Sequence, residues 1–555
     1  MFKKALWKLL VVFVVVAMVA ACAPTPAPTA APAAEPSKAE APAAEPTKAE
    51  APAAEPTKAE APADAGPKVF SIAINTDIDT WDPHGNRTMP VAAVLDYMVE
   101  ALVKTDKTGK VFPGLAKRWE VSADGLEMTF HLQEGVKFSD GTPFDAEAVK
   151  WNVERMNNPD VKTASKSPYN RIVSVEVIDP VTVKFVLDKY SAPLLQALAS
   201  TNMAMLSPTS VPKDSEAFIA LALNTPVGTG PYMLKEFVKG DHVLVTRNAD
   251  YWGEQPYFDE VLFRIVPDPA TRESLLLAGQ VDMAIAPPVT DLPQLQANDK
   301  LTVLVEPINR LIFFQINNQA QYLNDVRVRQ ALNYAVDKDA IINNVLMGLG
   351  KPVVSPMPDS FFGWCDVGSP YTYDPEKAKA LLKEAGVPEG YEVKFMAPTG
   401  RYPQDFQVGE AVAGYLGEVG LKATVETMDW PTYLSATGVP AAEATKDIWM
   451  MGWGSPYLHG SHTMMQFGSD QQPPNGFNNA YYVNPEVDAM IEAAASEPDQ
   501  TKAAQIYCDL NKKIWADAPW IFMYQLSYAV AYRADLTGVN IHPSDRYQAI
   551  YIHPK

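Results

Sequence analysis

An unbroken apolar run, Ile448 to Met451, is the feature that most constrains the fold of this chain. A run without alternation is typical of a strand buried on both faces, because a half-exposed strand alternates apolar and polar residues. The run ends at Gly452-Trp453-Gly454, where two glycines flank an indole. Glycine at a strand end permits close approach of another backbone, and the indole offers a flat apolar face. The stretch therefore predicts a ligand-lining strand end, with a core tryptophan beside a bulge as the alternative.

The N-terminal 21 residues have the pattern of an export signal, with three early lysines before a short apolar run. This run is shorter than the ~20 residues of a transmembrane helix. Val19-Ala-Ala-Cys22 resembles a bacterial lipobox, whose cysteine is lipidated and becomes the mature N-terminus. We therefore expect residues 1–21 to be a cleaved lipoprotein signal, with an uncleaved anchor as the alternative. Both place an exported chain at a membrane surface, periplasmic or on the outer face of the cytoplasmic membrane.

Residues 22–67 consist mainly of Ala, Pro, Glu, Thr and Lys. A ten-residue unit, Ala-Pro-Ala-Ala-Glu-Pro-Ser/Thr-Lys-Ala-Glu, recurs from Ala31, Ala41 and Ala51. Such a segment has no large apolar side chains to pack, and its prolines favour extended backbone. It is predicted to be a disordered stalk that holds the folded body away from the lipid.

Composition excludes some classes of function for the remaining residues. The formal net charge of −20 argues against nucleic acid or an anionic membrane as the main partner of the body. With Cys22 lipidated, Cys365 and Cys508 remain in an oxidising compartment, where they form either one disulfide or two buried thiols. The spacing of the three cysteines fits no zinc motif.

Local patterns predict several elements of the body. Asp124-Gly125 supplies a hairpin turn, and Asp145 caps a helix with a buried stripe. The segment 173–187 forms two alternating strands joined at Asp179-Pro180. Asp374 caps another helix, which Pro375 begins and Gly386 ends.

Seven blocks follow one another in the body: Pro113–Val121, Phe130–Val149, Pro226–Leu234, Asn248–Gly253, Phe314–Asn318, Asp325–Asp337 and Tyr373–Gly386. In this order they resemble family 5 extracellular solute-binding proteins, the peptide, dipeptide, oligopeptide and nickel binding components of ABC importers. The resemblance covers essentially everything after the stalk. It implies a periplasmic-binding-protein-like α/β fold, in which two lobes close around a ligand cleft by hinge motion.

The same resemblance implies the domain boundaries. Lobe I comprises residues 68–98, 212–309 and 528–555, and a subdomain of residues 99–211 is inserted in it. Lobe II comprises residues 310–527, and the chain enters it near Asn309-Arg310-Leu311. The Gly-Trp-Gly stretch would then face the cleft.

The ligand class follows from where the sequence departs from the family. Dipeptide and oligopeptide binders place an aspartate for the ligand ammonium three residues after the tryptophan, where this chain has Pro456. A subgroup places acidic residues at the position of Leu458–Ser461, which also carries none. An unpaired buried ammonium costs several kcal/mol, which argues against an ordinary dipeptide. Arg401 matches an arginine that holds a ligand carboxylate in some members, although a surface or inter-loop arginine is the alternative.

Other ligand classes remain open. His459 and His462 suggest a metal, but the segment 454–462 has no helical pattern and no carboxylate or thiolate accompanies the pair. Clustered aromatic residues could stack on a sugar, although such residues are more often core: Trp430, Trp449, Trp453 and Tyr457. The expected ligand-lining set is Gly452, Trp453, Gly454, Tyr457, Arg401 and His459, with no metal and no cofactor.

We therefore expect a monomeric, lipid-anchored solute-binding protein that delivers a peptide-like or other polar organic solute to an ABC permease and its ATPase. An oligosaccharide binder and a receptor that reports occupancy to a sensor are the alternatives, since transport and sensing use the same closed form. An enzyme is less favoured, because the sequence has no Gly-x-Ser-x-Gly, no His-Glu-x-x-His and no phosphate loop.

Overall fold

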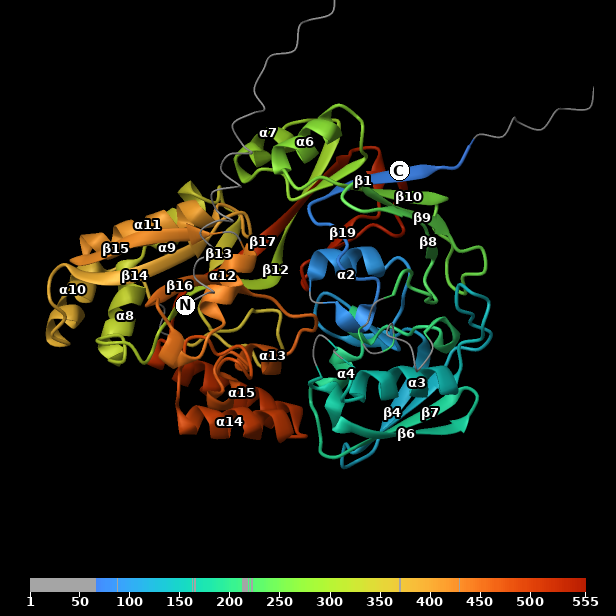
Figure 1. Cartoon of the computed structure of the whole chain (residues 1–555), viewed down its shortest axis with the longest axis horizontal. Helices are drawn as coiled ribbons and strands as arrows, with labels where there is room; N and C mark the ends of the chain where they lie inside the picture. Colours follow the sequence, from blue (N-terminus) through green and yellow to red (C-terminus); the bar gives the residue numbers. More distant parts are fainter. Residues whose placement is uncertain are drawn as a thin grey trace, which may run out of the picture. The chain divides into compact units, whose positions relative to one another are not determined.

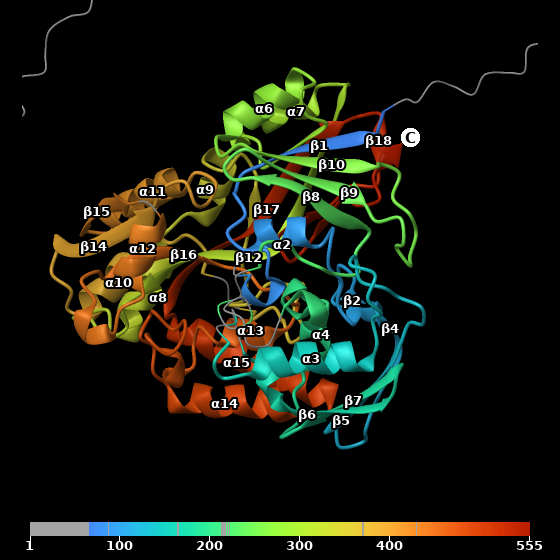
Figure 2. The same cartoon turned by 45° about the vertical axis from the view of Figure 1, so that its right-hand side comes forward.

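The computed structural model describes residues 66–555, except residues 87, 162, 164–165, 212–217, 219, 221–222, 369–370 and 429. The predicted signal, Cys22 and nearly all of the predicted stalk lie outside the described residues. Figures 1 and 2 show the body as two masses, one built around β14–β16 with α14 and α15, the other around β1 and β8–β10 with α3.

One eleven-stranded sheet runs through both masses. Its strands lie in the order β15 (Leu421–Met428), β14 (Tyr391–Pro398), β16 (Ile448–Trp453), β12 (Leu301–Ile316), β17 (Trp520–Arg533), β11 (Met283–Ile285), β1 (Val69–Ile74), β10 (Glu260–Ile265), β9 (His242–Arg247) and β8 (Tyr232–Val238), and β13 (Gly350–Pro352) pairs with β17. The predicted buried run is confirmed, since Ile448 to Met451 are buried between β12 and β14.

Two long antiparallel strands, β12 and β17, connect the two masses (Figure 1). Their pairing is interrupted between Pro307 and Leu311, where the register shifts. Such an interruption lets a strand bend, because the ladder hydrogen bonds are missing there. The predicted entry of the chain into lobe II at Asn309–Leu311 coincides with this register shift. The boundaries of the lobes stay a prediction.

Helices cover the sheet with the apolar stripes that their sequences carry. Asp374 accepts a hydrogen bond from Lys377 N at the start of α10, and Gly386 follows the helix with φ 73°, which confirms both predicted ends. Besides α3 and α13, the described helices are α2 (Met89–Leu95), α4 (Leu194–Ala197), α6 (Pro269–Leu277), α7 (Leu292–Gln296), α8 (Val326–Ala335), α9 (Lys338–Asn344), α10 (Pro375–Glu384), α11 (Asp405–Glu418), α12 (Trp430–Thr437), α14 (Pro485–Ser496) and α15 (Gln500–Asp517).

A separate four-stranded sheet lies within the predicted insertion, in the order β4 (Ala116–Val121), β5 (Glu127–Leu132), β7 (Thr182–Leu187) and β6 (Ile172–Asp179). The predicted β4–β5 hairpin is confirmed, and so is α3 (Ala146–Asn157), whose cap Asp145 accepts from Ala148 N at 2.9 Å. A short hairpin, β2 (Val103–Thr105) and β3 (Val111–Pro113), precedes this sheet.

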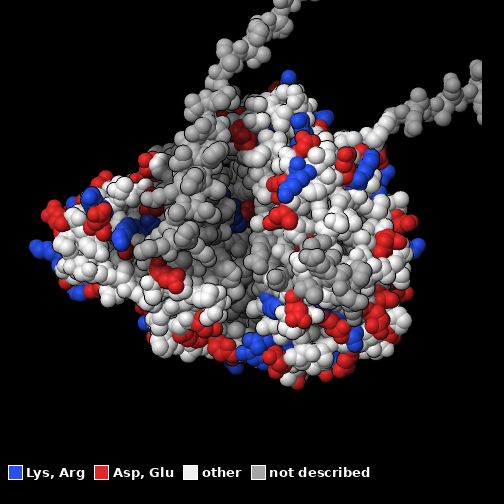
Figure 3. Space-filling view, in the orientation of Figure 1, with Lys and Arg blue, Asp and Glu red and all other residues white. Residues whose placement is uncertain are grey.

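The segment 454–462 was predicted to contain no helix, and this prediction is wrong for its last three residues. Gly460–Met464 form the short helix α13, and His459 is its N-cap, because the His459 ring nitrogen Nδ1 accepts from Ser461 N at 3.2 Å. Within the described part of the chain, every helix is too short or too polar to cross a bilayer. Acidic and basic side chains are mixed on the face drawn in Figure 3.

Candidate functional site

The Gly452–Gly454 strand end lies on the third strand from one edge of the large sheet, where β16 pairs with β12. Gly452 is paired with Ile312, and Trp453 with Leu311, directly beside the register break of β12. The strand end therefore sits where the crossing strands bend, which is where a ligand between two lobes would lie.

Gly452 makes room for the Tyr402 ring. A Cβ at position 452 would lie 2.7 Å from Tyr402 Cε1 and 2.8 Å from Ile312 Cδ1, closer than real contacts allow. Gly452 N donates to the Tyr402 hydroxyl at 2.8 Å. The glycine thus admits a side chain from the loop after β14, whereas the sequence predicted approach of a backbone.

Gly454 makes room for polar side chains of β12 in the same way. A Cβ there would lie 3.2 Å from Arg310 Nη2 and 3.3 Å from Asn309 Oδ1. Arg310 donates to one oxygen of Asp545, from Nε at 3.0 Å and from Nη2 at 2.7 Å. Asn309 binds both backbone groups of Ser455, at 2.8 and 3.1 Å. These contacts fix the chain after Gly454 onto the crossing strand.

Arg401 lies on a loop that Asp405 holds in place. The Asp405 carboxylate accepts from the backbone amides of Gly400, Arg401 and Tyr402 at 2.7 to 3.2 Å. The Arg401 guanidinium carbon lies 5.0 Å from the Tyr402 ring centre and 5.3 Å from that of Trp430. Burial lowers the pKa of Arg401, and the neighbouring Arg310 lowers it further.

Among the described residues, the Arg401 guanidinium has no hydrogen bond and no ion pair, although the residue is only partly exposed. A guanidinium that keeps its charge in an enclosed position is costly unless an anion pairs with it. Within the described part of the chain, Arg401 thus has unused N–H donors next to Tyr402, the residue that binds Gly452.

Trp453 is half-buried beneath His462. The two rings stack with centres 4.8 Å apart, and the Trp453 indole donates to the His462 carbonyl at 3.2 Å. Phe477, which is exposed, lies 4.9 Å from the Trp453 ring. The indole edge and Phe477 provide apolar surface next to Gly454.

Tyr457 and His459 are enclosed by protein. The Tyr457 ring packs into the apolar cluster of the four-stranded sheet. His459 stacks on Phe362 with ring centres 5.0 Å apart, and burial lowers the pKa of His459 to about 3. Burial lowers the pKa of His462 to about 3 as well, so both imidazoles are neutral at pH 7. No group of three or more potential metal ligands occurs in the described portion of the chain.

The structure brings Arg401, Gly452 and Gly454 together through Tyr402 and Arg310, while Tyr457 and His459 face protein. Sequence reasoning missed Tyr402, Arg310 and Asp545 as members of this site. Tyr402 directly follows Arg401, which was a usable signal. Nothing local pairs Arg310 with Asp545, which is 235 residues away.

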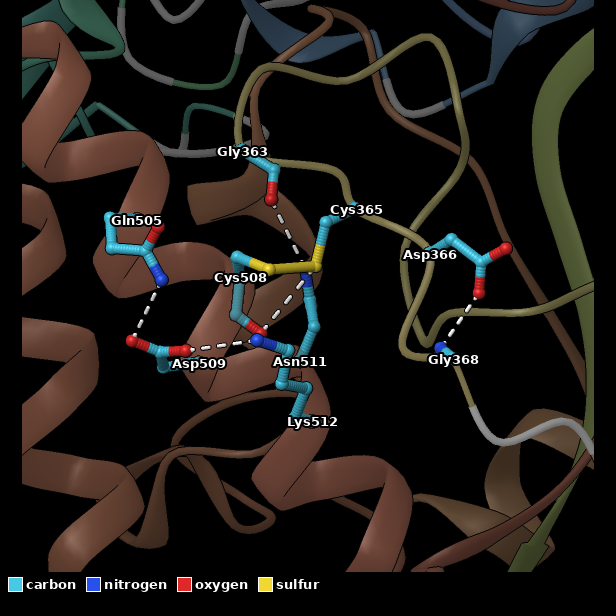
Figure 4. Close-up of a disulfide and its surroundings, with 9 residues drawn as sticks. All are labelled: Gly363, Cys365, Asp366, Gly368, Gln505, Cys508, Asp509, Asn511 and Lys512. Atoms are coloured by element: carbon cyan, nitrogen blue, oxygen red, sulfur yellow. Dashed lines mark hydrogen bonds and ion pairs between the residues drawn. A yellow bond between two sulfur atoms is a disulfide. The ribbon is translucent and has the colours of Figure 1, made fainter.

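Cys365 and Cys508 are joined in a disulfide with Cα atoms 5.4 Å apart (Figure 4). The bond links α15 to the loop that contains Phe362. Asn511 on the same helix donates to the Gly363 carbonyl at 3.1 Å, which gives the loop a second attachment.

Two α/β masses are joined by two crossing strands, and beside the glycines of the strand end lies an arginine with no ion pair among the described residues. This is the architecture of a two-lobed binding protein. The chain belongs to the bacterial extracellular solute-binding proteins, family 5. Residues 110–475 match the sequence pattern of this family, which is described as "Bacterial extracellular solute-binding proteins, family 5 Middle". This confirms the resemblance, the two-lobed α/β fold and the role as the substrate-binding component of an ABC importer.

Particular relatives share most of the chain. The glutathione-binding protein GsiB of Salmonella paratyphi A is 31% identical over 475 residues, which cover 85% of this chain and 92% of that protein. NikZ from Campylobacter jejuni, solved with Ni(L-His), superposes with a TM-score of 0.75 at 25% identity, over 86% of this chain and 96% of NikZ.

DppA from Helicobacter pylori, solved with the peptide STSA, also has a TM-score of 0.75. It is 24% identical, over 88% of this chain and 98% of DppA. These relatives are binding proteins of transport systems, and the family is extracellular or periplasmic and works with permease and ATPase subunits.

Proposed function

We propose that this chain captures a small peptide-like solute through a carboxylate that Arg401 binds. The observation that carries the proposal is the Arg401 guanidinium, which has no hydrogen bond or ion pair to any residue that the structure describes and lies over Tyr402, the partner of Gly452. Two parallel N–H donors of arginine match the two oxygens of a carboxylate, and such charge-assisted bonds are about twice as strong as neutral ones.

The charges around the strand end support an acidic solute. Arg310 and Asp545 neutralise one another, so Arg401 leaves this group of three residues with one positive charge. Asp405 is occupied by backbone amides. The donors of Arg401, which no described residue uses, therefore complement a carboxylate of the ligand.

Glutathione has two carboxylates at neutral pH, and Arg401 could bind either of them. The relatives named glutathione-binding proteins make it the first solute to test. The apolar edge of Trp453 and Phe477 is the feature that a sugar would use, so an oligosaccharide is the second candidate.

Isothermal titration calorimetry of the full chain with glutathione tests the proposal, using Arg401→Gln, Arg401→Lys and the exposed control Arg118→Gln. Loss of a charge-assisted pair should weaken binding by on the order of tenfold to a hundredfold in Arg401→Gln. Arg401→Lys should recover part of the loss, and the control should bind as the natural chain does. Equal binding of all four proteins would contradict the role of Arg401.

We also propose that lipid on Cys22 holds the protein at the membrane, with residues 22–67 as a spacer, and that the occupied form docks on a permease. The small-residue box before Cys22 supports the anchor. Cys22→Ala should move the protein from the detergent phase to the aqueous phase on Triton X-114 partition. Unchanged partition would refute a lipid on Cys22.

A further inference from the structure

Two polar contacts join the two masses along a rim that lies away from the crossing strands β12 and β17. One side of the rim is the segment 188–191, which follows β7, and the other is α14 with the first residue of α15. Figures 1 and 2 both draw α14 beside the four-stranded sheet at the lower edge of the body, with the crossing strands above them. A hinge rotation at the crossing strands would therefore pull the two sides of the rim apart.

The rim pairs two neighbouring residues of one mass with two helices of the other. Lys189 Nζ lies 2.6 Å from Glu492 Oε1 on α14, and Gln500 Nε2, at the start of α15, donates to the Tyr190 hydroxyl at 3.0 Å. The Lys189 side chain is 40% exposed and that of Glu492 is 65% exposed, so water screens the ion pair. A pair of this kind changes an equilibrium by up to about fivefold.

The charges on the two sides of the rim are complementary. On the first side, Asp188 pairs with Arg171 at 3.3 Å, so the positive charge of Lys189 is left to face α14. The second side carries three carboxylates and one ammonium: Glu492, Glu497, Asp499 and Lys502. A negative charge in place of Lys189 would therefore oppose contact between the two sides.

The Tyr190 ring is supported by its own mass. It packs against the β4–β5 turn, where Gly125 has φ 70° and where a Cβ would overlap the ring. Because the ring is already held in place, the bond between its hydroxyl and Gln500 requires little further ordering. Burial raises the pKa of Tyr190, so the hydroxyl keeps its proton at pH 7 and accepts the Gln500 hydrogen bond as a neutral group.

A third contact between the two masses is apolar. Tyr457 follows the strand end of β16, but its ring is only 6% exposed and belongs to the apolar cluster of the four-stranded sheet. The neighbouring Leu458 lies against the β2–β3 turn, since a Cβ on Gly109 would be 3.2 Å from Leu458 Cβ. Separation of the masses would expose both side chains to water, which is unfavourable in proportion to the apolar area uncovered.

We propose that these contacts form a latch that holds the two lobes closed without help from a solute. The polar part of the latch is Lys189–Glu492 with Tyr190–Gln500, and the apolar part is Tyr457. Since the apparent affinity for a solute rises with the fraction of closed chain, the latch tunes binding from outside the binding site. Arg401 does not belong to the latch, so the latch acts in the same way on any solute.

Distances between two nitroxide labels on the solute-free, dialysed full chain test the latch without a ligand. The labels are placed at two exposed positions, Ser174→Cys on β6 and Ala489→Cys on α14. Cys22→Ala removes the remaining thiol, because Cys365 and Cys508 are joined in the disulfide. Pulsed electron–electron resonance should show a short distance for closed chains and a longer distance for open chains, and their areas give the closed-to-open ratio.

Variants identify the contacts that set this ratio. Lys189→Glu should lower it by about threefold to tenfold, and the exchange Lys189→Glu with Glu492→Lys should restore it to within about twofold. Tyr457→Leu should lower it by about tenfold, because a smaller side chain fills less of the apolar cluster.

The control Lys239→Glu makes the same charge change at an exposed position in the β8–β9 turn and should leave the ratio unchanged. A natural chain that is wholly open without solute would overturn the proposal. The same conclusion would follow if Lys189→Glu left the ratio unchanged, or if the exchange of charges did not restore it.

Discussion

Replacing Gly452 with alanine should destabilise the protein and weaken ligand binding together. The new methyl group would lie 2.7 Å from the Tyr402 ring and 2.8 Å from Ile312. Relief of this overlap moves Tyr402 and breaks its 2.8 Å bond from Gly452 N. Overpacking costs about 1–3 kcal/mol, and a buried amide without an acceptor costs about 1–3 kcal/mol. We therefore expect the free energy of unfolding to fall by about 2–5 kcal/mol.

Urea denaturation of the full chain, followed by tryptophan fluorescence, measures this change. Gly454→Ala should cost less, about 1 kcal/mol, because its nearest contacts are 3.2 and 3.3 Å. Gly414→Ala on α11 should instead stabilise by about 0.5–1 kcal/mol, since nothing lies within 4 Å of its Cβ position.

A double variant isolates the cause. If overlap with Tyr402 is responsible, Gly452→Ala should cost much less in a Tyr402→Ala background, because the methyl group then has room. Calorimetry should show weaker glutathione binding in Gly452→Ala, since Arg401 is carried by the same loop as Tyr402. A neutral Gly452→Ala, or an unchanged cost without the Tyr402 ring, would refute the reasoning.

Three further predictions concern stability. Burial lowers the pKa of His84 to about 4 and that of His459, His542 and the partly exposed His462 to about 3. The unfolded chain therefore binds more protons than the folded chain below pH 6.5. The contribution of these histidines to the free energy of unfolding is therefore complete above about pH 6.5 and is lost as the pH falls towards 4. Urea midpoints measured across this range should fall with pH, and midpoints that do not change with pH would contradict the prediction. The Cys365–Cys508 bond closes a separation of 143 residues, so the double alanine variant should lose about 2–5 kcal/mol, and reductant should then have no further effect on its midpoint. Asp82→Asn should cost about 3–5 kcal/mol by denaturation, because it removes the charge facing the fully buried Arg155, whereas Asp188→Asn, at an exposed arginine pair, should cost under about 1 kcal/mol.

Local patterns were enough to predict the elements that build the lobes. The run Ile448–Met451, the Asp124-Gly125 turn and the caps Asp145 and Asp374 depend on neighbours within a few residues. Short segments of sequence are therefore sufficient to predict these elements. The order of the strands in the large sheet was not predicted, because it depends on pairing between segments far apart in sequence.

The contacts that make the site depend on residues far apart in sequence. Tyr402 and Gly452 are 50 residues apart, and Arg310 and Asp545 are 235 apart. The helix α13 was missed because it is short and its first four residues, glycine, serine, histidine and threonine, are weak helix formers. Its cap is also an imidazole, which is not among the usual N-cap side chains. Tertiary packing determines these long-range contacts and this short helix, and no local sequence pattern predicts them.

The ligand that the protein carries is the remaining question of function. Native mass spectrometry of the full chain as purified, followed by denaturation and identification of the released molecule, answers it, because closed two-lobed binders release ligand slowly. We predict a small peptide-like mass with a free carboxylate, present in the natural chain and depleted in Arg401→Gln. A neutral sugar or a metal ion retained equally by both proteins would contradict the assignment of Arg401 as the ligand anchor.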